Sequence, residues 1–189
     1  MATSELETGS SAKNVSGTGI ILFLISEFFL FGALFFVYYY LRIVSTTWPP
    51  PDVQLSMVHP IVNTILLLSS SFTMAASIRA WRNNDISSMA RFLVITIGMG
   101  VAFLGITIWE WTAESFRPWS HAYGSIFYTL TGFHALHVFG GVVLMLALVT
   151  RARHRGITLA SHSVEVASWY WHYVDAIWIL VFTTLFIVR

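Results

Sequence analysis

The stretch Gly19–Tyr40, GIILFLISEFFLFGALFFVYYY, is long, almost wholly apolar, and carries a single acid, Glu27. About twenty consecutive apolar residues are enough for an α-helix to cross the hydrocarbon core of a membrane. Glu27 lies roughly ten residues inside such a helix, which is about 15 Å deep at 1.5 Å per residue. A carboxyl group is costly at that depth in lipid, so we expect Glu27 to face a protein interior or a neighbouring helix.

The rest of the chain has the same apolar character. Of its 189 residues, 56% are hydrophobic and only 10% are charged, whereas about a quarter of the residues in a soluble domain are charged. The chain has no cysteine, which excludes disulfides and thiolate metal sites, and its net charge near zero gives no case for nucleic-acid binding. The pattern predicts an all-α, polytopic membrane helix bundle with five transmembrane helices, at about 17–43, 59–80, 90–112, 124–150 and 165–188.

The distribution of charge predicts the domain organisation and the orientation. Residues 1–16 are polar and small and are expected to form a disordered cytoplasmic tail, followed by a single transmembrane domain at 17–189. Seven of the ten Lys and Arg residues fall on the side of the membrane that carries the N-terminus: Lys13, Arg79, Arg82, Arg91, Arg151, Arg153 and Arg155. This bias places the N-terminus in the cytoplasm and the C-terminus outside. The start of the chain resembles no transit peptide, which favours the bacterial plasma membrane.

Four further ionisable residues lie in pairs within the last two predicted helices. His134 and His137 are spaced i, i+3, and so are His172 and Asp175, so each pair shares one helix face. Histidines on two helices could ligate a b-type haem or a metal. The small number of ligands favours the other interpretation, in which buried imidazoles pair with carboxylates such as Asp175 and tie helices together.

The remaining polar and small residues have structural interpretations. Glu110, near the outer end of the third helix, is expected to be a structural acid that snorkels to the interface, and Glu165 to favour the start of the fifth helix. The serines at 69–71 are expected to hydrogen-bond between helices. The glycines are expected to permit close helix packing, namely Gly98, Gly100, Gly105, Gly132, Gly140 and Gly141. For Glu27, a proton-relay role and a purely structural role both remain open.

Four motifs occur in order along the chain: ISEFFLFGALFF, WPP, YGSIFYTLTGFHALHVFGG and VEVASWYWHYVDAIWI. Together they closely resemble subunit III of the haem–copper cytochrome oxidases, over about residues 17–188. The most specific part is GFHALHV followed, about thirty residues later, by WYWHYVD.

The resemblance implies an all-helical membrane subunit that has no redox cofactor of its own. It would pack mainly against catalytic subunit I, in a complex with subunit II and possible further respiratory subunits, and haem a and copper would reside in those partners. Subunit III of this family is associated with proton uptake, with protection of the catalytic core during turnover, and with phospholipid held between its helices. The fuller form has seven helices, and this chain resembles the five-helix bacterial form that lacks the first two. Another subunit, or lipid held more loosely, would replace the missing wall of the lipid cleft.

The family's functional residues can be placed on this sequence. Its intramembrane, carbodiimide-reactive glutamate falls on Glu27, which favours a proton-related carboxyl there. Its histidines fall on His134, His137 and His172, where they are structural or lipid-facing groups rather than metal ligands. Arg151 falls where the family has a basic group near lipid phosphate. No catalytic or metal-binding residue is expected on this chain.

The expected function is therefore that of a non-catalytic subunit III of a proton-pumping aa3- or caa3-type cytochrome c oxidase in aerobic respiration. Four groups on the cytoplasmic side are expected to collect protons, namely His154, His162, Arg79 and Arg82. One alternative is a subunit III-like partner of nitric oxide reductase. A second alternative is a haem b electron carrier that uses His172 with His134 or His137. A third is a transporter with Glu27 as its coupling carboxyl, but the sequence shows no internal repeat of the kind that is typical of transporters.

Overall fold

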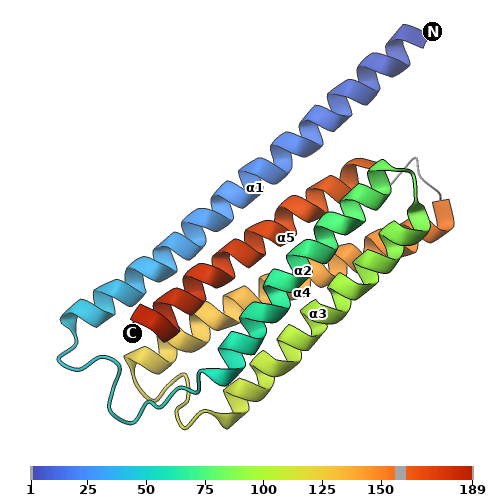
Figure 1. The fold of residues 1–189 in the computed structure, drawn as a ribbon. Coiled ribbons are helices and arrows are strands. Elements are labelled where there is room, and N and C mark those ends of the chain that lie inside the picture. The colour runs from blue at the N-terminus through green and yellow to red at the C-terminus, as the bar shows by residue number, and fades with distance from the viewer. Residues whose placement is uncertain (1, 156–160, 189) are drawn as a thin grey trace.

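The computed structural model describes residues 2–155 and 161–188, with side chains for 18–152 and 163–188. Within these ranges the chain forms five α-helices and no strand (Figure 1): α1 (Ala2–Val44), α2 (Val58–Arg82), α3 (Ile86–Ala113), α4 (Ala122–Arg155) and α5 (Ser161–Phe182). A short π-helix, η2 (Thr183–Val188), continues α5. All five helices are long and apolar enough to cross a membrane. The predicted all-α architecture with five spans is thereby confirmed.

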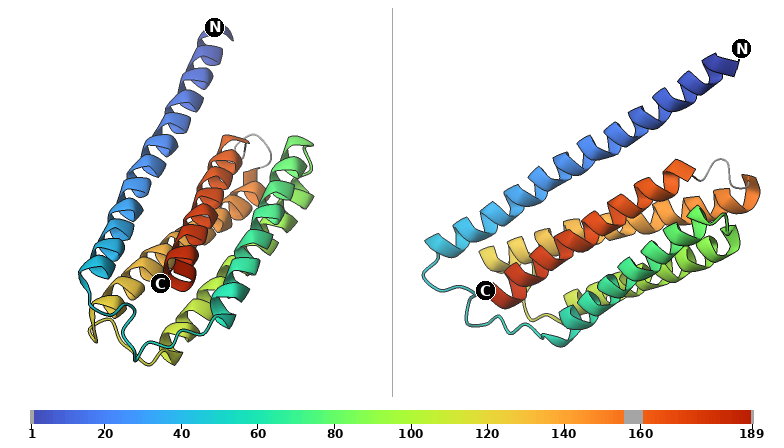
Figure 2. Two further views of the ribbon diagram at one scale, coloured as in Figure 1. Left: turned by 60° about the vertical axis from the view of Figure 1, so that its left-hand side comes forward. Right: turned by 45° about the horizontal axis from the view of Figure 1, so that its top comes forward.

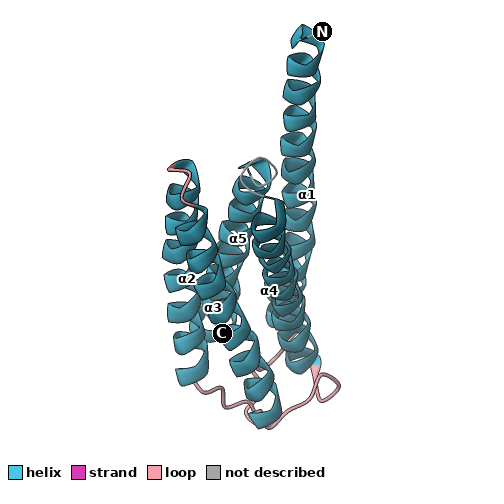
Figure 3. Cartoon of the chain, turned by 90° about the vertical axis from the view of Figure 1, so that its right-hand side faces the viewer, coloured by secondary structure: helices cyan, strands magenta, loops and turns pink. Residues whose placement is uncertain are grey.

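Helices α2 to α5 form a four-helix bundle, and α1 packs on one side of it. The main contacts join α2 to α3 and α5, and α4 to α3 and α5, whereas α1 contacts α4 and α5. Figures 2 and 3 show α1 separated from α2 and α3 by the α4–α5 pair. Most apolar side chains of α1 are therefore exposed, up to 81% for Ile43. In a membrane this surface must be covered by lipid or by another protein chain.

The two ends of the chain lie at opposite ends of the bundle (Figure 1), as an odd number of spans requires. Which end faces the cytoplasm remains a prediction. Helix α1 begins at Ala2. In the structure, the polar segment that was predicted to be a disordered tail therefore continues the helix of the first span. The division of the chain into a tail and a membrane domain stays a prediction as well.

An aromatic cluster fixes the end of α1 against the start of α4. The Trp48 ring, in the connection between α1 and α2, lies 5.4 Å from Tyr38 of α1 and 5.1 Å from Tyr123 of α4, measured between ring centroids. Tyr38 and Tyr123 are completely buried. Edge-to-face aromatic pairs of this kind add about 0.5–1.5 kcal/mol beyond the burial of their area. The cluster therefore sets the position of α1, and with it the position of Glu27, which lies about three helical turns from Tyr38 on the same helix.

Trp171 of α5 occupies the centre of the four-helix bundle. Its ring is completely buried, and its Nε1 donates a hydrogen bond of 2.9 Å to Ser70 Oγ of α2. A Cβ atom added at Gly100 of α3 or at Gly141 of α4 would come within 2.9 or 2.7 Å of the Trp171 ring. These two glycines give the indole its space, so the predicted role in close packing is confirmed for them. It is wrong for Gly98 and Gly105, around which an added Cβ would meet nothing within 4 Å in the described residues.

Replacing Gly141 by alanine is expected to destabilise the bundle, because the new methyl group would overlap the Trp171 ring. Overpacking of this kind costs about 1–3 kcal/mol. Gly105→Ala is the matched control, since it adds the same methyl group to α3 in open space and removes a helix-destabilising glycine. Thermal unfolding of both variants in detergent checks the difference. An equal midpoint for the two variants would contradict the packing described here.

The start of α3 gives a pH-dependent prediction. Asp85 is the N-cap residue, and its side chain accepts a hydrogen bond of 2.9 Å from the backbone N–H of Ser88. The side-chain and backbone hydrogen bonds from Ser88 lower the pKa of Asp85 below its usual 3.8. Because the folded-state pKa is depressed, the stabilisation is present above pH 3.8 and is lost as the pH falls through the folded-state value.

We therefore expect Asp85→Ala to lower the thermal midpoint at neutral pH, with a difference from the wild type that shrinks in acid. Asp85→Asn should stay close to the wild type at neutral pH, because asparagine caps helices as well as aspartate does. Melting curves at about pH 7 and about pH 3 measure both effects. A loss in Asp85→Ala that is the same at both pH values would show that the ionised cap is not its cause.

Candidate functional site: a glutamate–histidine pair between α1 and α4

Glu27 of α1 and His137 of α4 form a direct pair. Glu27 Oε2 lies 2.8 Å from His137 Nε2, and the two side chains are 16% and 12% exposed. The acid therefore meets a neighbouring helix, as the sequence predicted for a carboxyl at this depth. Its partner was not predicted, because the two residues are 110 positions apart in the sequence.

The hydrogen bond of the second ring nitrogen of His137 limits the proton arrangements that this pair can adopt. Nδ1 is 2.6 Å from the carbonyl oxygen of Phe133, one turn earlier in α4. A carbonyl oxygen can only accept, so Nδ1 carries a hydrogen. The distance between Nε2 and Oε2 requires a hydrogen between them as well. With that proton on His137 the pair is an imidazolium and a carboxylate, and with it on Glu27 the pair is a neutral ring and a neutral acid.

Both arrangements have zero net charge and the same positions of the heavy atoms. The pair can thus transfer one proton across a single hydrogen bond without placing a net charge inside the membrane, where an unpaired charge is costly. This is the chemistry that the geometry makes available: a proton held between a carboxyl and an imidazole, at an interface between two helices.

Aromatic residues enclose the pair. The Phe31 ring packs edge-on against His137 at a centroid distance of 5.1 Å. Tyr170 of α5 donates a hydrogen bond of 3.0 Å to the carbonyl oxygen of His137 and so ties α5 to the same turn of α4. Sequence reasoning missed Tyr170, although its place in the WYWHY motif was a signal. An apolar groove of about 350 Å³ runs beside the pair between α1 and α5, lined by Ile21, Leu24, Ile25, Phe28, Phe29 and Tyr173.

A second polar cluster joins α2 to α5. Ser71 Oγ donates a hydrogen bond to Asp175 Oδ2 and lies 3.1 Å from His172 Nδ1. Asp175 is buried, with 4% of its surface exposed. His172 and Asp175 thus do share a helix face, and the link between them runs through the serine. Ser70 accepts a hydrogen bond from Trp171, so two of the three serines at 69–71 bond between helices as expected.

His134 and Glu110 differ from the paired residues. The His134 ring is completely buried and packs near Phe103 and Trp178, at centroid distances of 5.5 and 5.0 Å. Within the described residues, neither of its nitrogens has a hydrogen-bond partner. Glu110 is 3% exposed, so it is buried and does not snorkel to the interface. One turn further on, burial raises the pKa of Glu114, just beyond the end of α3.

Four arginines lie at one end of the bundle, which we call the basic end: Arg79, Arg82, Arg91 and Arg151. Arg42 and Arg117 lie at the opposite end. Arg82 Nη2 lies 3.5 Å from Glu165 Oε1, so Glu165 faces α2 as well as lying in the first turns of α5. Arg79 and Arg151 are exposed and form no ion pair within the described residues. The side chains of His154 and His162, which were expected to collect protons, lie outside the described residues.

Fold and site define the class of protein: a helical, multi-pass membrane protein in which a glutamate of one helix, Glu27, is paired with a histidine of another, His137. Comparison with known proteins gives the particular family. Residues 7–188 match the family described as cytochrome c oxidase subunit III. The chain belongs to this family, which confirms the resemblance found in the sequence motifs and places the chain in the respiratory electron-transport machinery.

Individual relatives of the chain support the same family assignment. The chain is 39% identical to cytochrome c oxidase subunit 3 of Thermostichus vulcanus over 171 residues, which cover 89% of this chain and 85% of the relative. It is 36% identical over 181 residues to a probable cytochrome c oxidase subunit 3 of Mycobacterium tuberculosis, with 93% and 89% covered. The subunit 3 of Branchiostoma lanceolatum is 32% identical over 176 residues, 67% of its length. As a member of this family, the chain forms a complex with other oxidase subunits.

Proposed function

We propose that this chain is the non-catalytic subunit III of a proton-pumping aa3- or caa3-type cytochrome c oxidase in a bacterial plasma membrane. In that complex it stabilises subunit I, supports proton uptake and binds structural lipid. The observation that carries the proposal beyond family membership is the Glu27–His137 pair, because it is an ionisable, proton-sharing contact deep in a helix interface.

The pair supports a role close to proton uptake for a physical reason. A carboxyl kept only for packing is readily replaced by an apolar side chain, whereas an acid matched with an imidazole can accept or release a proton as its surroundings change. When a nearby subunit takes up protons, such a pair responds by moving its shared proton between Oε2 and Nε2. Its surroundings, rather than its own chemistry, decide which form is held.

The exposed surface of α1 supports the proposed assembly. The helix has apolar side chains on nearly all sides, and only a few, such as Phe31 and Tyr38, are buried in the chain itself. A helix that is apolar all round is suited to contact other helices or lipid on every side. We infer that α1 is flanked in the complex by subunit I or by lipid.

We also propose that the redox centres of the complex lie in partner subunits. Both ring nitrogens of His137 already take part in hydrogen bonds, and Nδ1 of His172 contacts Ser71. Haem ligation by His137 would require the Glu27 contact to break. For His137 and His172, the geometry thus favours a structural and proton-related role over haem ligation. A nitric oxide reductase partner remains the alternative, and it would differ in the catalytic subunit rather than in this chain.

Purification of the tagged chain from its own membranes in a mild detergent tests the proposal. We expect oxidase subunits I and II to co-purify in a fixed ratio, with a reduced-minus-oxidised spectrum of haem a. The matched control is a tagged membrane protein of similar size from the same cells. A haem b spectrum with a nitric oxide reductase subunit would move the chain to the alternative enzyme, and a chain that binds no haem protein would contradict both.

A further inference from the structure

Three buried polar side chains from three helices form a layer across the four-helix bundle. Asn63 of α2 donates a hydrogen bond of 3.1 Å from Nδ2 to Thr107 Oγ1 of α3, and His134 of α4 lies at a similar depth. We call these three residues the polar layer. We propose that the polar layer and Glu110 bind internal water, through which the Glu110 carboxyl exchanges its proton with the aqueous phase at the end opposite the basic end. The proposal is independent of the proposed function.

The depth of His134 follows from the contacts between α3 and α4. The Phe103 ring of α3 packs against the His134 ring at a centroid distance of 5.5 Å. Nearer the opposite end, Trp111 Nε1 donates a hydrogen bond of 3.2 Å to Thr131 Oγ1, and Thr131 lies one turn from His134 on α4. Since Thr107 is midway between these two contacts on α3, it lies within about one turn of His134 in depth.

The polar layer and Glu110 carry buried atoms that have no hydrogen-bond partner within the described residues: Asn63 Oδ1, Glu110 Oε1, and both Nδ1 and Nε2 of His134. Each of these residues has at most 3% of its surface exposed. Buried polar groups are nearly always hydrogen-bonded, because an unpaired one is costly. The unpaired atoms therefore indicate a bound polar molecule.

Water is the molecule that suits this set of atoms. Asn63 Oδ1 can only accept a hydrogen bond, whereas a neutral His134 ring offers one donor and one acceptor, so the occupant must both donate and accept. Buried water typically makes about three hydrogen bonds to groups that would otherwise be unpaired. A metal ion suits the site less well, because the described residues contain no group of three or more His, Cys, Asp or Glu side chains that could hold one.

A polar groove gives this region access to the surface at the opposite end. It encloses about 410 Å³, lies between the α1–α2 connection, the start of α2 and the end of α3, and contains the ionisable groups Asp52, His59 and Glu114. The backbone N–H of Glu114 donates a hydrogen bond of 3.1 Å to the carbonyl oxygen of Glu110, one turn deeper on α3. The step from the groove to Glu110 is therefore about 6 Å along the helix axis, a distance that water can bridge.

Glu110 is expected to hold its proton in mildly acidic buffer. Its carboxyl belongs to none of the ion pairs among the described residues, and a buried, unpaired charge is costly inside a membrane. The other ionisable groups at this end of α3 are Glu114, Tyr128 and Arg117, and the last two donate hydrogen bonds to the carbonyl oxygen of Trp111. Exchange replaces the carboxyl hydrogen by one from water, so no net charge enters the bundle.

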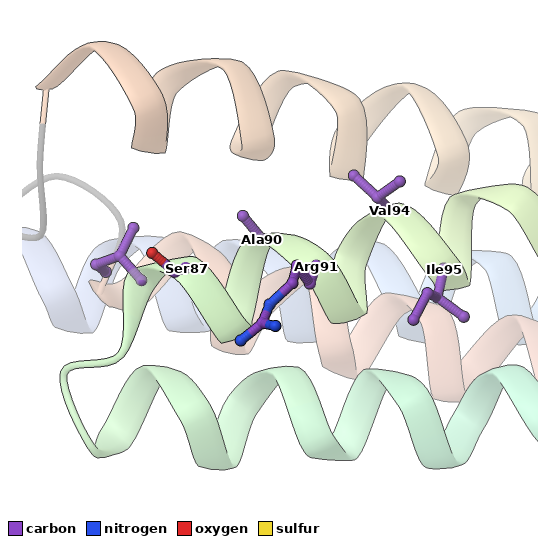
Figure 4. Close-up of a pocket in the computed structure, with 6 residues that line it drawn as sticks. Ser87, Ala90, Arg91, Val94 and Ile95 are labelled. Carbon is purple, nitrogen blue, oxygen red and sulfur yellow. The ribbon is translucent and has the colours of Figure 1, made fainter.

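A hollow along α3 at the basic end provides a comparison (Figure 4). It encloses about 580 Å³, more than the polar groove, and the six residues that line it all belong to α3, from Ile86 to Ile95. The buried α3 residues at this end are Met89 and Leu93, which are apolar, and Thr96, whose Oγ1 lies 2.7 Å from Thr73 Oγ1. These three residues offer no unpaired polar atom to water, so Thr96 is a matched control for the polar layer.

Hydroxyl radicals produced from bound water test the water site in the wild-type protein. The full-length chain is purified in mild detergent with the subunits that stay bound to it, exposed to a short X-ray pulse and analysed by mass spectrometry. Trp178, whose ring lies 5.0 Å from the His134 ring, should be oxidised although it is only 2% exposed. Trp171 on the same helix is also buried, but its Nε1 is bonded to Ser70, and it should stay unmodified.

Two variants locate the water. Asn63→Leu removes an unpaired acceptor and should abolish the oxidation of Trp178, whereas Thr96→Val should leave it unchanged. Equal oxidation of Trp178 and Trp171 in the wild type, whether high or low, would contradict a water site at the polar layer. Equal effects of Asn63→Leu and Thr96→Val would contradict it as well.

Infrared spectra of the same preparation test the proton exchange. The carbonyl band of a protonated carboxyl that disappears in Glu110→Gln belongs to Glu110, and we expect this band to shift within minutes of transfer into D₂O. Ala113→Leu narrows the polar groove and should slow the shift about tenfold, which corresponds to ~1.4 kcal/mol in the barrier to exchange. Ala90→Leu, in the hollow of Figure 4 on the same helix, is the matched control and should not change the rate.

Three results of this experiment would overturn the proposed exchange. If Glu110→Gln removes no carboxyl band, Glu110 is ionised and holds no proton to exchange. If the band shifts no faster than the slowest backbone amides exchange, no water reaches the carboxyl. If Ala113→Leu and Ala90→Leu have equal effects on the rate, the polar groove is not the route.

Discussion

Glu27→Leu is expected to lower the free energy of unfolding of the chain by about 1–3 kcal/mol, because it leaves His137 Nε2 without a partner in a largely buried position. The loss should concern the contact between α1 and α4 rather than the four-helix bundle. Unfolding by a denaturing detergent in mixed micelles, followed by circular dichroism, measures it. Glu27→Gln is the matched control, because its side-chain amide can donate to Nε2 and keep the contact.

A double-mutant cycle separates this pair from its surroundings. His137→Leu should cost about as much as Glu27→Leu, and the double variant should cost little more than either, which gives a coupling energy of about 1–2 kcal/mol for a polar contact inside a membrane protein. Simple additivity of the two losses would contradict the direct pairing. A Glu27→Gln variant as unstable as Glu27→Leu would show that the ionisable group itself, and not the hydrogen bond, holds the helices together.

Trp171→Ala is expected to have the largest effect on stability, about 3–5 kcal/mol. The substitution removes a completely buried ring from the space between Gly100 and Gly141 and leaves Ser70 without its donor. Trp169→Ala, two residues earlier on α5, is the matched control because that side chain is partly exposed. The same detergent unfolding measures both. A loss of similar size for the two tryptophans would contradict the central position of Trp171.

The helices were predictable because hydropathy and chain breakers determine them. The second span was predicted at 59–80 and α2 is Val58–Arg82. Helix α4 continues to Arg155, beyond the predicted residue 150, because a helix need not end where the hydrocarbon ends and its last residues are basic. Charge near a helix end therefore limits the membrane-spanning part of the helix but not the helix itself.

The pairing of the polar residues was less predictable. The sequence marks Glu27 as a residue that needs a partner, but α1 is apolar on nearly every face, so its pattern does not reveal which side docks on α4. Whether His137 or His134 becomes the partner depends on how α1 and α4 are rotated about their own axes when they pack together. By contrast, His172 and Asp175 lie on one face of one helix, and a serine on α2 was already expected to bond between helices. Contacts within a helix can be predicted from the spacing of residues in the sequence. Contacts between helices can be identified only once it is known how the helices pack.

The most direct test of the account is a comparison of purified oxidase complexes that contain the wild-type chain, Glu27→Gln and Gly105→Ala. Oxygen consumption is followed through prolonged turnover, together with proton uptake. We predict that Glu27→Gln assembles normally but loses proton uptake or activity faster than the other two, because glutamine keeps the contact with His137 and cannot release a proton. Equal turnover, proton uptake and lifetime in all three complexes would contradict the proton-related role and leave Glu27 as a packing residue.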